Sequence, residues 1–298
     1  MTNYSTNIIK ILIAAVIIST SSVWVNIAQV APSVSGFYRM FIGGVLLLII
    51  CALKRKTLWH TWNHFFWLFL AAVFFAFDLY FWHRSIFYIG PGLATVLGNF
   101  QVFFMALAGY LFFKEKIGLA FIVGLFVTIA GLFILVGINW SGLSSQYKTG
   151  VIYGILTALS YTGFMLSMRH VQSNEKGLSA FANLGIMSAI CALLLFIQLN
   201  FEGLNINIPS TQSLVSLLML GVVCQVVGWL LITQSMPNLP ASIVGVVLLL
   251  QPALSMLWDV IFFDRPMEML DFIGLGMVLT GVYLATLKKS KSKSQFQR

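Results

Sequence analysis

Two stretches of this chain, one in each half, follow the same pattern. Residues 101–131 read QVFFMALAGYLFFKEKIGLAFIVGLFVTIAG, and residues 251–281 read QPALSMLWDVIFFDRPMEMLDFIGLGMVLTG. Aligned without a gap, they share Gln101 with Gln251, Leu107 with Leu257, Phe112-Phe113 with Phe262-Phe263, Gly124-Leu125 with Gly274-Leu275 and Gly131 with Gly281. Similar composition does not easily match a glutamine, a Phe-Phe pair and two glycines at once, so we predict an internal repeat.

Apolar residues dominate the chain around these stretches. Hydrophobic residues make up 59% of its 298 positions and charged residues only 8%, against roughly a quarter charged in a soluble domain. This composition excludes a soluble globule. The apolar segments are each near the ~20 residues with which an α-helix crosses a bilayer. We therefore predict an all-α integral membrane protein with ten transmembrane helices, at residues 8–28, 34–53, 65–84, 92–113, 117–138, 150–170, 178–199, 213–235, 241–262 and 271–287.

The repeat divides the predicted helices into two sets of five, in residues 1–140 and 141–298. Because five is odd, the second set must enter the membrane in the opposite sense to the first. The loop charges agree, since Lys114-Glu115-Lys116 follows Phe113 whereas residues 264–270, after Phe263, are net acidic. Inverted repeats are typical of secondary transporters, in which two equivalent halves expose one central site alternately.

The distribution of lysine and arginine predicts the orientation. With ten crossings, both termini lie on one side of the membrane. If that side is the cytoplasm, the inner segments hold Lys10, Lys54, Arg55, Lys56, Lys114, Lys116, Arg169, Lys176, Lys288, Lys289, Lys291, Lys293 and Arg298. The outer segments then keep Arg84, Lys148 and Arg265. By the positive-inside rule we expect both termini in the cytoplasm, with the chain in the cell inner membrane.

Several motifs give the chain a resemblance to a known family. Ser35-Gly36-Phe37-Tyr38-Arg39 opens the second predicted helix, and Phe112-Phe113-Lys114-Glu115-Lys116 precedes the glycines of the fifth. With the five-plus-five arrangement, the chain resembles the EamA-type family of the drug/metabolite transporter superfamily over nearly its whole length. It departs from the family at Gln101-Val102, where a Gln-Pro pair like Gln251-Pro252 is frequent, and at Arg265-Pro266, where a glutamate is usual. The resemblance implies a transporter, with export as its direction.

Two charged side chains are expected deep inside predicted helices, with Asp78 as the only clearly deep acid. Arg39 and Asp78 are each about six residues from the outer ends of their helices, ~9 Å below the boundary. Unpaired charges at that depth are costly, so we expect the two to be partners. As a functional site they would line the outer part of a cavity, with Arg39 receiving a carboxylate or phosphate and Asp78 an amine or a proton. The alternative is a structural ion pair, or an arginine that extends to the interface.

Uncharged residues complete the candidate substrate-binding site. Gln101 and Gln251 are expected near mid-membrane, where inverted-repeat transporters keep their sites. Pro252 predicts a bend beside Gln251, because it removes one backbone hydrogen bond. Tyr161 and Trp24 are predicted to provide apolar or stacking contacts. Interhelical hydrogen bonding is the alternative for the polar residues, and close helix packing is our interpretation of Gly98, Gly124, Gly131, Gly274 and Gly281.

The sequence lacks the motifs of the other function classes considered. The chain has no HExxH or GxGD motif for an intramembrane enzyme, and no GxxxxGK[ST] loop for a nucleotide-driven pump. His60 and His64 have the spacing of a metal pair but lie in a cytoplasmic loop among tryptophans, so we predict no metal and no cofactor. The basic tail is more simply a topology signal, so nucleic acid is not an expected partner.

These observations together predict a secondary transporter of small organic solutes that works by alternating access and exports amino acids or related metabolites. Its expected partners are the solute and the lipid bilayer, with a homodimer left open. Coupling to protons through Asp78 and uncoupled facilitation both remain open. The runner-up is a carrier for phosphorylated or nucleotide-linked metabolites, ranked lower because only Arg39 offers a deep cation. From another class, the alternative is a non-transporting intramembrane enzyme or scaffold.

Overall fold

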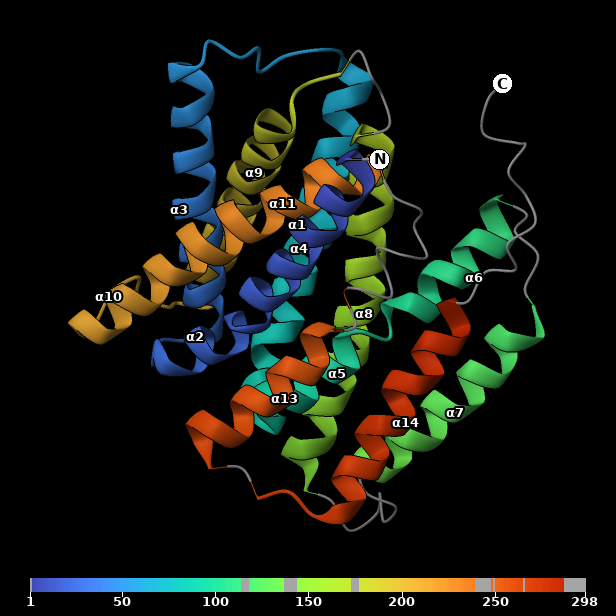
Figure 1. Cartoon of the computed structure of the whole chain (residues 1–298). Coiled ribbons are helices and arrows are strands. Elements are labelled where there is room, and N and C mark those ends of the chain that lie inside the picture. Colours follow the sequence, from blue (N-terminus) through green and yellow to red (C-terminus); the bar gives the residue numbers. More distant parts are fainter. Residues whose placement is uncertain are drawn as a thin grey trace.

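All regular structure in the described residues is helical. In this computed structural model those residues are 2–113, 118–136, 144–172, 177–238, 248, 250–264 and 266–286. The first half forms α1 (Thr2–Ser19), α2 (Ser21–Ile27), α3 (Pro32–Leu53), α4 (Trp62–Ile89), α5 (Pro91–Gly98), α6 (Gln101–Phe113) and α7 (Leu119–Val136). The second half forms α8 (Ser145–Gln172), α9 (Ala180–Phe201), α10 (Thr211–Leu218), the π-helix η2 (Met219–Gly228), α11 (Trp229–Ser235), the 3-10 helix η3 (Met236–Asn238), α13 (Leu250–Phe263) and α14 (Met269–Thr286), as Figure 1 shows.

Local sequence explains where several helices begin. Thr61, Ser179 and Ser210 each precede a helix, and each side chain accepts a hydrogen bond from a backbone N–H three residues later. Such caps satisfy donors that the first helical turn leaves without a partner. Pro32 and Pro91 stand at the starts of α3 and α5, where the missing N–H removes no helical bond.

The helices have the lengths of membrane spans. Six segments are long and apolar enough to cross a bilayer: Ser5–Ile27, Pro32–Leu53, Trp62–Ile89, Ser145–Gln172, Ala180–Phe201 and Thr211–Ser235. Four shorter apolar helices are Pro91–Met105, Ile122–Gly131, Leu250–Phe263 and Met269–Gly281. Each of the ten predicted segments overlaps one of these, although residues 241–247 and 249 of the ninth lie outside the described part. The chain is a multi-pass membrane protein.

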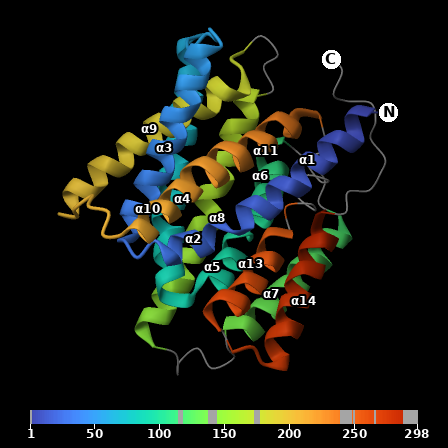
Figure 2. The same ribbon diagram turned by 60° about the vertical axis from the view of Figure 1, so that its left-hand side comes forward.

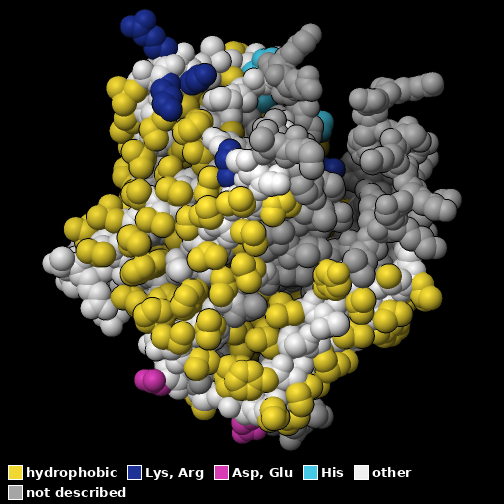
Figure 3. All heavy atoms as spheres, in the orientation of Figure 1, with side chains coloured by type: hydrophobic (Ala, Val, Ile, Leu, Met, Phe, Trp, Pro, Cys, Tyr) yellow, Lys and Arg dark blue, Asp and Glu magenta, His cyan; other side chains and the backbone are white. Residues whose placement is uncertain are grey.

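The surface agrees with this location. On the face drawn in Figure 3, apolar side chains cover most of the described surface, while Lys and Arg gather at the end where α3 meets α4. Lys54, Arg55 and Lys56 follow α3 there and are exposed. Acidic side chains lie toward the opposite end of the same face. Exposed apolar side chains that water would disfavour are suited to contact with lipid.

Helices α7 and α14 pack against each other at the glycines of the repeat. A Cβ at Gly131 would lie 2.7 Å from the backbone oxygen of Gly274, and one at Gly281 would lie 2.6 Å from that of Gly124. The contact position rises along one helix as it falls along the other, so the two helices are antiparallel. The interpretation of these glycines as points of close helix approach is confirmed.

Helices α3 and α9 pack in the same way. A Cβ at Gly44 would lie 3.0 Å from the backbone nitrogen of Ala189, and one at Gly185 would lie 3.1 Å from the Leu47 Cβ. This pair is therefore antiparallel too, and both views of the fold show α3 beside α9 and α7 beside α14 (Figures 1 and 2). An inverted repeat predicts this antiparallel packing between equivalent helices of the two halves.

Three of the apolar segments are interrupted, and all three interruptions adjoin one region of the molecule. The first lies at Thr20, between α1 and α2, and the second at residues 99–100, between α5 and α6. The third is the π-helix η2, which widens the helix between α10 and α11. π-Helical insertions such as η2 frequently occur at functional positions in helices.

Candidate functional site

A cavity of about 70 Å³ lies where these interrupted helices meet. That volume has room for several water molecules. Both halves of the chain contribute to its wall, which consists of Ile18, Ser21, Arg39, Phe75, Asp78, Trp82, Thr95, Gly98, Asn99, Gln101, Thr157, Tyr161, Trp229, Gln251 and Ser255.

Most of the predicted site residues are brought together in this wall. Arg39, Asp78, Gln101, Tyr161 and Gln251 all line it, from α3, α4, α6, α8 and α13. Trp24 is the one member of the predicted set that is not among the residues of this wall, and its stacking role stays a prediction. It lies on α2, and its Nε1 donates to Thr20 Oγ1 at 3.1 Å, one turn earlier on the chain. This bond ties the indole N–H to the break between α1 and α2.

Arg39 lies deep in the fold and is held on one side only. It is 3% exposed, and its Nε donates to Oε1 of Gln225 at 3.2 Å. Its guanidinium also lies 5.9 Å from the centre of the Phe75 ring and 5.8 Å from that of Trp82. Aromatic faces attract a cation at these distances, more strongly when water is excluded. Among the described residues, the bond to Gln225 is the only hydrogen bond that Arg39 makes.

Asp78 is buried as predicted, but its surroundings differ from the expectation. It is 6% exposed, and within the described ranges no ion pair joins it to Arg39. Helix α4 continues to Ile89, past the predicted end at residue 84. Asp78 therefore lies roughly 16 Å from the end of its helix, instead of ~9 Å. The expected ion pair is replaced by a cation and an anion that face the same cavity separately.

The two repeat-related glutamines also face this cavity. The backbone oxygen of Gln101 accepts a hydrogen bond from Thr162 Oγ1 at 3.3 Å. Its side-chain Oε1 is buried and has no hydrogen-bond partner within the described part of the chain. Gln251 lies at the start of α13, beside the buried Pro252. The bend predicted there stays a prediction, because residues 239–247 and 249 lie outside the described part.

Aromatic rings form an apolar side of the cavity. Trp229 lies 5.7 Å from Tyr161 and 5.5 Å from Phe75, measured between ring centres. Phe164 stacks on Phe75 behind the wall at 4.2 Å. The cavity thus combines two opposite charges and the three amides of Asn99, Gln101 and Gln251 with an apolar aromatic surface. No group of three or more His, Cys, Asp or Glu side chains in the described residues is placed to hold a metal ion.

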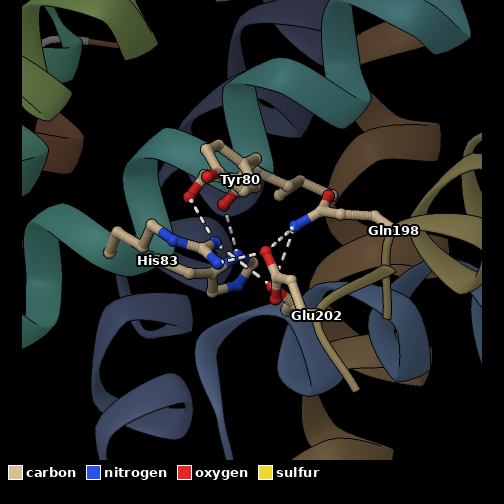
Figure 4. A network of polar contacts seen from close by, with 7 residues as sticks. Tyr80, His83, Gln198 and Glu202 are labelled. Carbon is tan, nitrogen blue, oxygen red and sulfur yellow. Dashed lines mark hydrogen bonds and ion pairs between the residues drawn. The ribbon is translucent and has the colours of Figure 1, made fainter. Parts of the chain in front are cut away.

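A polar network near one end of the fold was not predicted. Arg84 of α4 forms an ion pair with Glu202, the residue that caps α9, and Glu202 also accepts from Ser33 Oγ at 2.7 Å and Gln198 Nε2 at 2.9 Å. Figure 4 shows Gln198 and Glu202 facing Tyr80 and His83 of α4. The network joins helices of the two halves outside the cavity. Its ion-pair partners are far apart in sequence, so no spacing in the chain could indicate it.

A second buried acid was also missed. Asp259 of α13 is 2% exposed, and its Oδ2 accepts a hydrogen bond from the backbone N–H of Gly92 at 3.2 Å. A Cβ at Gly92 would lie 2.5 Å from Met256 Sδ, so only glycine allows this approach of α5 to α13. The prediction that Asp78 is the only deep acid is therefore wrong; Asp259 is a second one.

Comparison with known proteins identifies the family. The model of the EamA-like transporter family matches residues 5–137 and 148–287. An uncharacterized transporter of Haemophilus influenzae is 28% identical over 137 residues, covering 45% of each chain. The uncharacterized transporter YvbV of Bacillus subtilis is 23% identical over 90% of this chain and 87% of its own, and one of Archaeoglobus fulgidus is 23% identical over 89% and 92%.

The fold is shared with a solved structure as well. A structure titled "Crystal structure of protein" superposes with a TM-score of 0.70 at 15% identity, covering 95% of this chain and 98% of that one. The chain spans about half the length of the Haemophilus relative, whereas it spans most of the Bacillus YvbV and Archaeoglobus relatives. From the two matched segments, which cover nearly the whole sequence, it follows that this chain is a member of the EamA-like transporter family.

Proposed function

We propose that this transporter carries small zwitterionic solutes, amino acids or related metabolites, out of the cell by alternating access. The observation that carries the proposal is the cavity in which Arg39 and Asp78 both lie without forming an ion pair with each other. A buried charge without a counter-charge is strongly disfavoured in a membrane protein. A solute that brings a carboxylate to Arg39 and an ammonium group to Asp78 would neutralise both.

The remaining wall suits the rest of an amino acid. Gln101 and Gln251 offer amide donors and acceptors, and Gln101 Oε1 is buried without a partner. Phe75, Tyr161 and Trp229 offer an apolar surface for a side chain. Binding sites typically combine a largely apolar wall with a few polar groups that set orientation.

A carrier for phosphorylated metabolites is the second candidate. Two or more negative charges would call for several cations, and Arg39 is the one Lys or Arg in the described cavity wall. Asp78 in the same wall would repel a phosphate. These charges favour a zwitterion over a dianion.

We further propose that ten helices cross the cell inner membrane, with both termini in the cytoplasm. The antiparallel packing of α3 on α9 and of α7 on α14 supports two oppositely inserted halves, residues 1–140 and 141–298. The exposed Lys54, Arg55 and Lys56 between α3 and α4 would lie on the cytoplasmic side. Two such halves can rock around a central site and expose it to each side in turn.

A flux measurement tests the proposed substrate class. Proteoliposomes containing the full chain would be loaded with radiolabelled L-leucine, and efflux would be compared with that from protein-free liposomes. We expect efflux that excess L-amino acids inhibit, that Arg39→Gln abolishes and that Asp78→Asn lowers without abolishing it. Lys54→Gln, in the exposed loop, serves as the control and should leave flux unchanged. Efflux inhibited by sugar phosphates alone would overturn the proposal in favour of the second candidate.

A further inference from the structure

Gln225 is a completely buried amide that the cavity wall does not include. It lies in the π-helix η2 within an apolar run, and its exposed fraction is 0%. Its Oε1 accepts from Arg39 Nε at 3.2 Å, and its Nε2 donates to Ser188 Oγ at 3.2 Å. The amide therefore connects α3, η2 and α9, which belong to both halves of the chain.

The backbone around Gln225 is built to admit this side chain. A Cβ at Gly43 of α3 would lie 2.5 Å from Gln225 Cγ and 3.0 Å from its Cβ. A Cβ at Gly221, within η2, would lie 2.6 Å from the Ile42 Cβ. Glycine on both facing helices lets them approach closely enough for the amide to reach Arg39.

The bond to Nε determines how Arg39 presents its charge. A guanidinium is planar, so fixing Nε restricts the direction in which both Nη groups point. Among the described residues neither Nη donates a hydrogen bond, and Arg39 lines the cavity. Two parallel N–H groups of this kind match the two oxygens of a carboxylate. Gln225 thus acts on the cavity through Arg39 and does not touch its contents.

The neutrality of Gln225 matters as much as its shape. A carboxylate in the same place would accept the same hydrogen bond and would also neutralise the arginine. The free Nη groups would then attract a solute carboxylate much less. An amide holds the two Nη groups of Arg39 in position and leaves the full positive charge of the guanidinium available.

We infer that Gln225 is the positioning residue that makes the cavity selective for solutes bearing a carboxylate, by aiming a fully charged Arg39 into it. The inference rests on the proposed function and deepens it. It assigns recognition of the carboxylate to the Gln225–Arg39 pair and recognition of the ammonium group to Asp78, so the two can be tested apart.

The test compares three matched probes on the purified full chain. L-Leucine carries both charges, 3-methylbutylamine lacks the carboxylate, and 4-methylpentanoate lacks the amine. In Gln225→Glu we expect the affinities for L-leucine and 4-methylpentanoate to fall about tenfold or more, the loss expected for a charge-assisted contact. The affinity for 3-methylbutylamine should be unchanged or rise. A role confined to folding would instead weaken all three probes together.

Two further variants keep the outcome interpretable. Gln234→Glu makes the same substitution on α11, outside the cavity wall, and should leave the three affinities unchanged. Gln225→Met removes both hydrogen bonds at similar length and should also weaken carboxylate binding. Equal affinities of Gln225→Glu and wild type for L-leucine and 4-methylpentanoate would overturn the inference. If the wild type does not bind L-leucine, the proposed function fails together with the inference; if it binds L-leucine and Gln225→Glu binds it equally well, only the inference fails.

Discussion

Replacing one glycine at the contact between α7 and α14 gives a test of the fold that the structure makes quantitative. Gly131→Ala would place a Cβ 2.7 Å from the Gly274 oxygen and 2.9 Å from the Val278 nitrogen. Both are backbone atoms, which cannot rotate away. The helices must separate by about 0.7 Å before the first contact reaches the 3.4 Å at which ordinary packing begins. Overpacking of this kind costs ~1–3 kcal/mol.

A control on the same pair of helices isolates that cost. Gly276 lies on α14, and a Cβ there would meet nothing within 4 Å. Gly276→Ala therefore gains only the better helix propensity of alanine, up to ~1 kcal/mol. Gly131→Ala has the same gain, so the difference between the two variants should be the clash alone. We expect Gly131→Ala to be the less stable by ~1–3 kcal/mol.

Thermal unfolding of the purified chain, followed by tryptophan fluorescence in one detergent, would measure this difference. For a chain of this size it corresponds to roughly 2–12 °C in apparent Tm. Gly281→Ala should behave like Gly131→Ala, because it meets the backbone of Gly124 in the equivalent position. If Gly131→Ala unfolds at or above the temperature of Gly276→Ala, the backbone contact between α7 and α14 does not exist as described.

Three further variants probe the other features. Glu202→Gln removes the partner of Arg84; since both side chains are partly exposed, we expect a loss of about 1 kcal/mol, seen as a lower apparent Tm that Arg84→Gln reproduces. Asp78→Asn removes the titratable group from the cavity while keeping its shape. If Asp78 carries a coupling proton, liposomes containing this variant lose the response of solute flux to a pH gradient, and a full response would exclude that role. Trp24→Phe should change L-leucine affinity by less than about twofold, whereas Trp229→Phe, in the cavity wall, should lower it; equal effects in a binding assay would contradict the assignment of the wall.

Features that depend on periodicity and symmetry could be predicted from the sequence. The repeat aligns Gly131 with Gly281 and thereby predicts close helix packing at both. The same alignment predicts a shared mid-membrane position for Gln101 and Gln251, which line one cavity. Apolar length was enough to find the helices, since membrane spans must satisfy their own backbone hydrogen bonds. Arg39 and Asp78 were identified because intramembrane charge is rare.

Contacts between residues that are far apart in the sequence could not be predicted. Gln225 stands alone in an apolar run, and only the π-helix and the glycine at position 43 bring it to Arg39. The ion pair of Arg84 with Glu202 joins residues 118 positions apart. Asp78 was placed too near the membrane surface because α4 continues past His83 and Arg84, where the predicted helix ended, to Ile89. Helix ends are the least certain part of such predictions.

The hydrogen bond between the Gly92 amide and Asp259 constrains how the two halves can separate. Its donor belongs to the main chain, and glycine at residue 92 keeps that donor within reach, because a Cβ there would lie 3.0 Å from the accepting Asp259 Oδ2 itself. Any motion that separates α5 from α13 breaks this bond and leaves the buried Gly92 N–H without its acceptor, at a free-energy cost of about 1–3 kcal/mol. The energy of opening between α5 and α13 therefore depends on both ends of this bond, a glycine at residue 92 and a hydrogen-bond acceptor at residue 259.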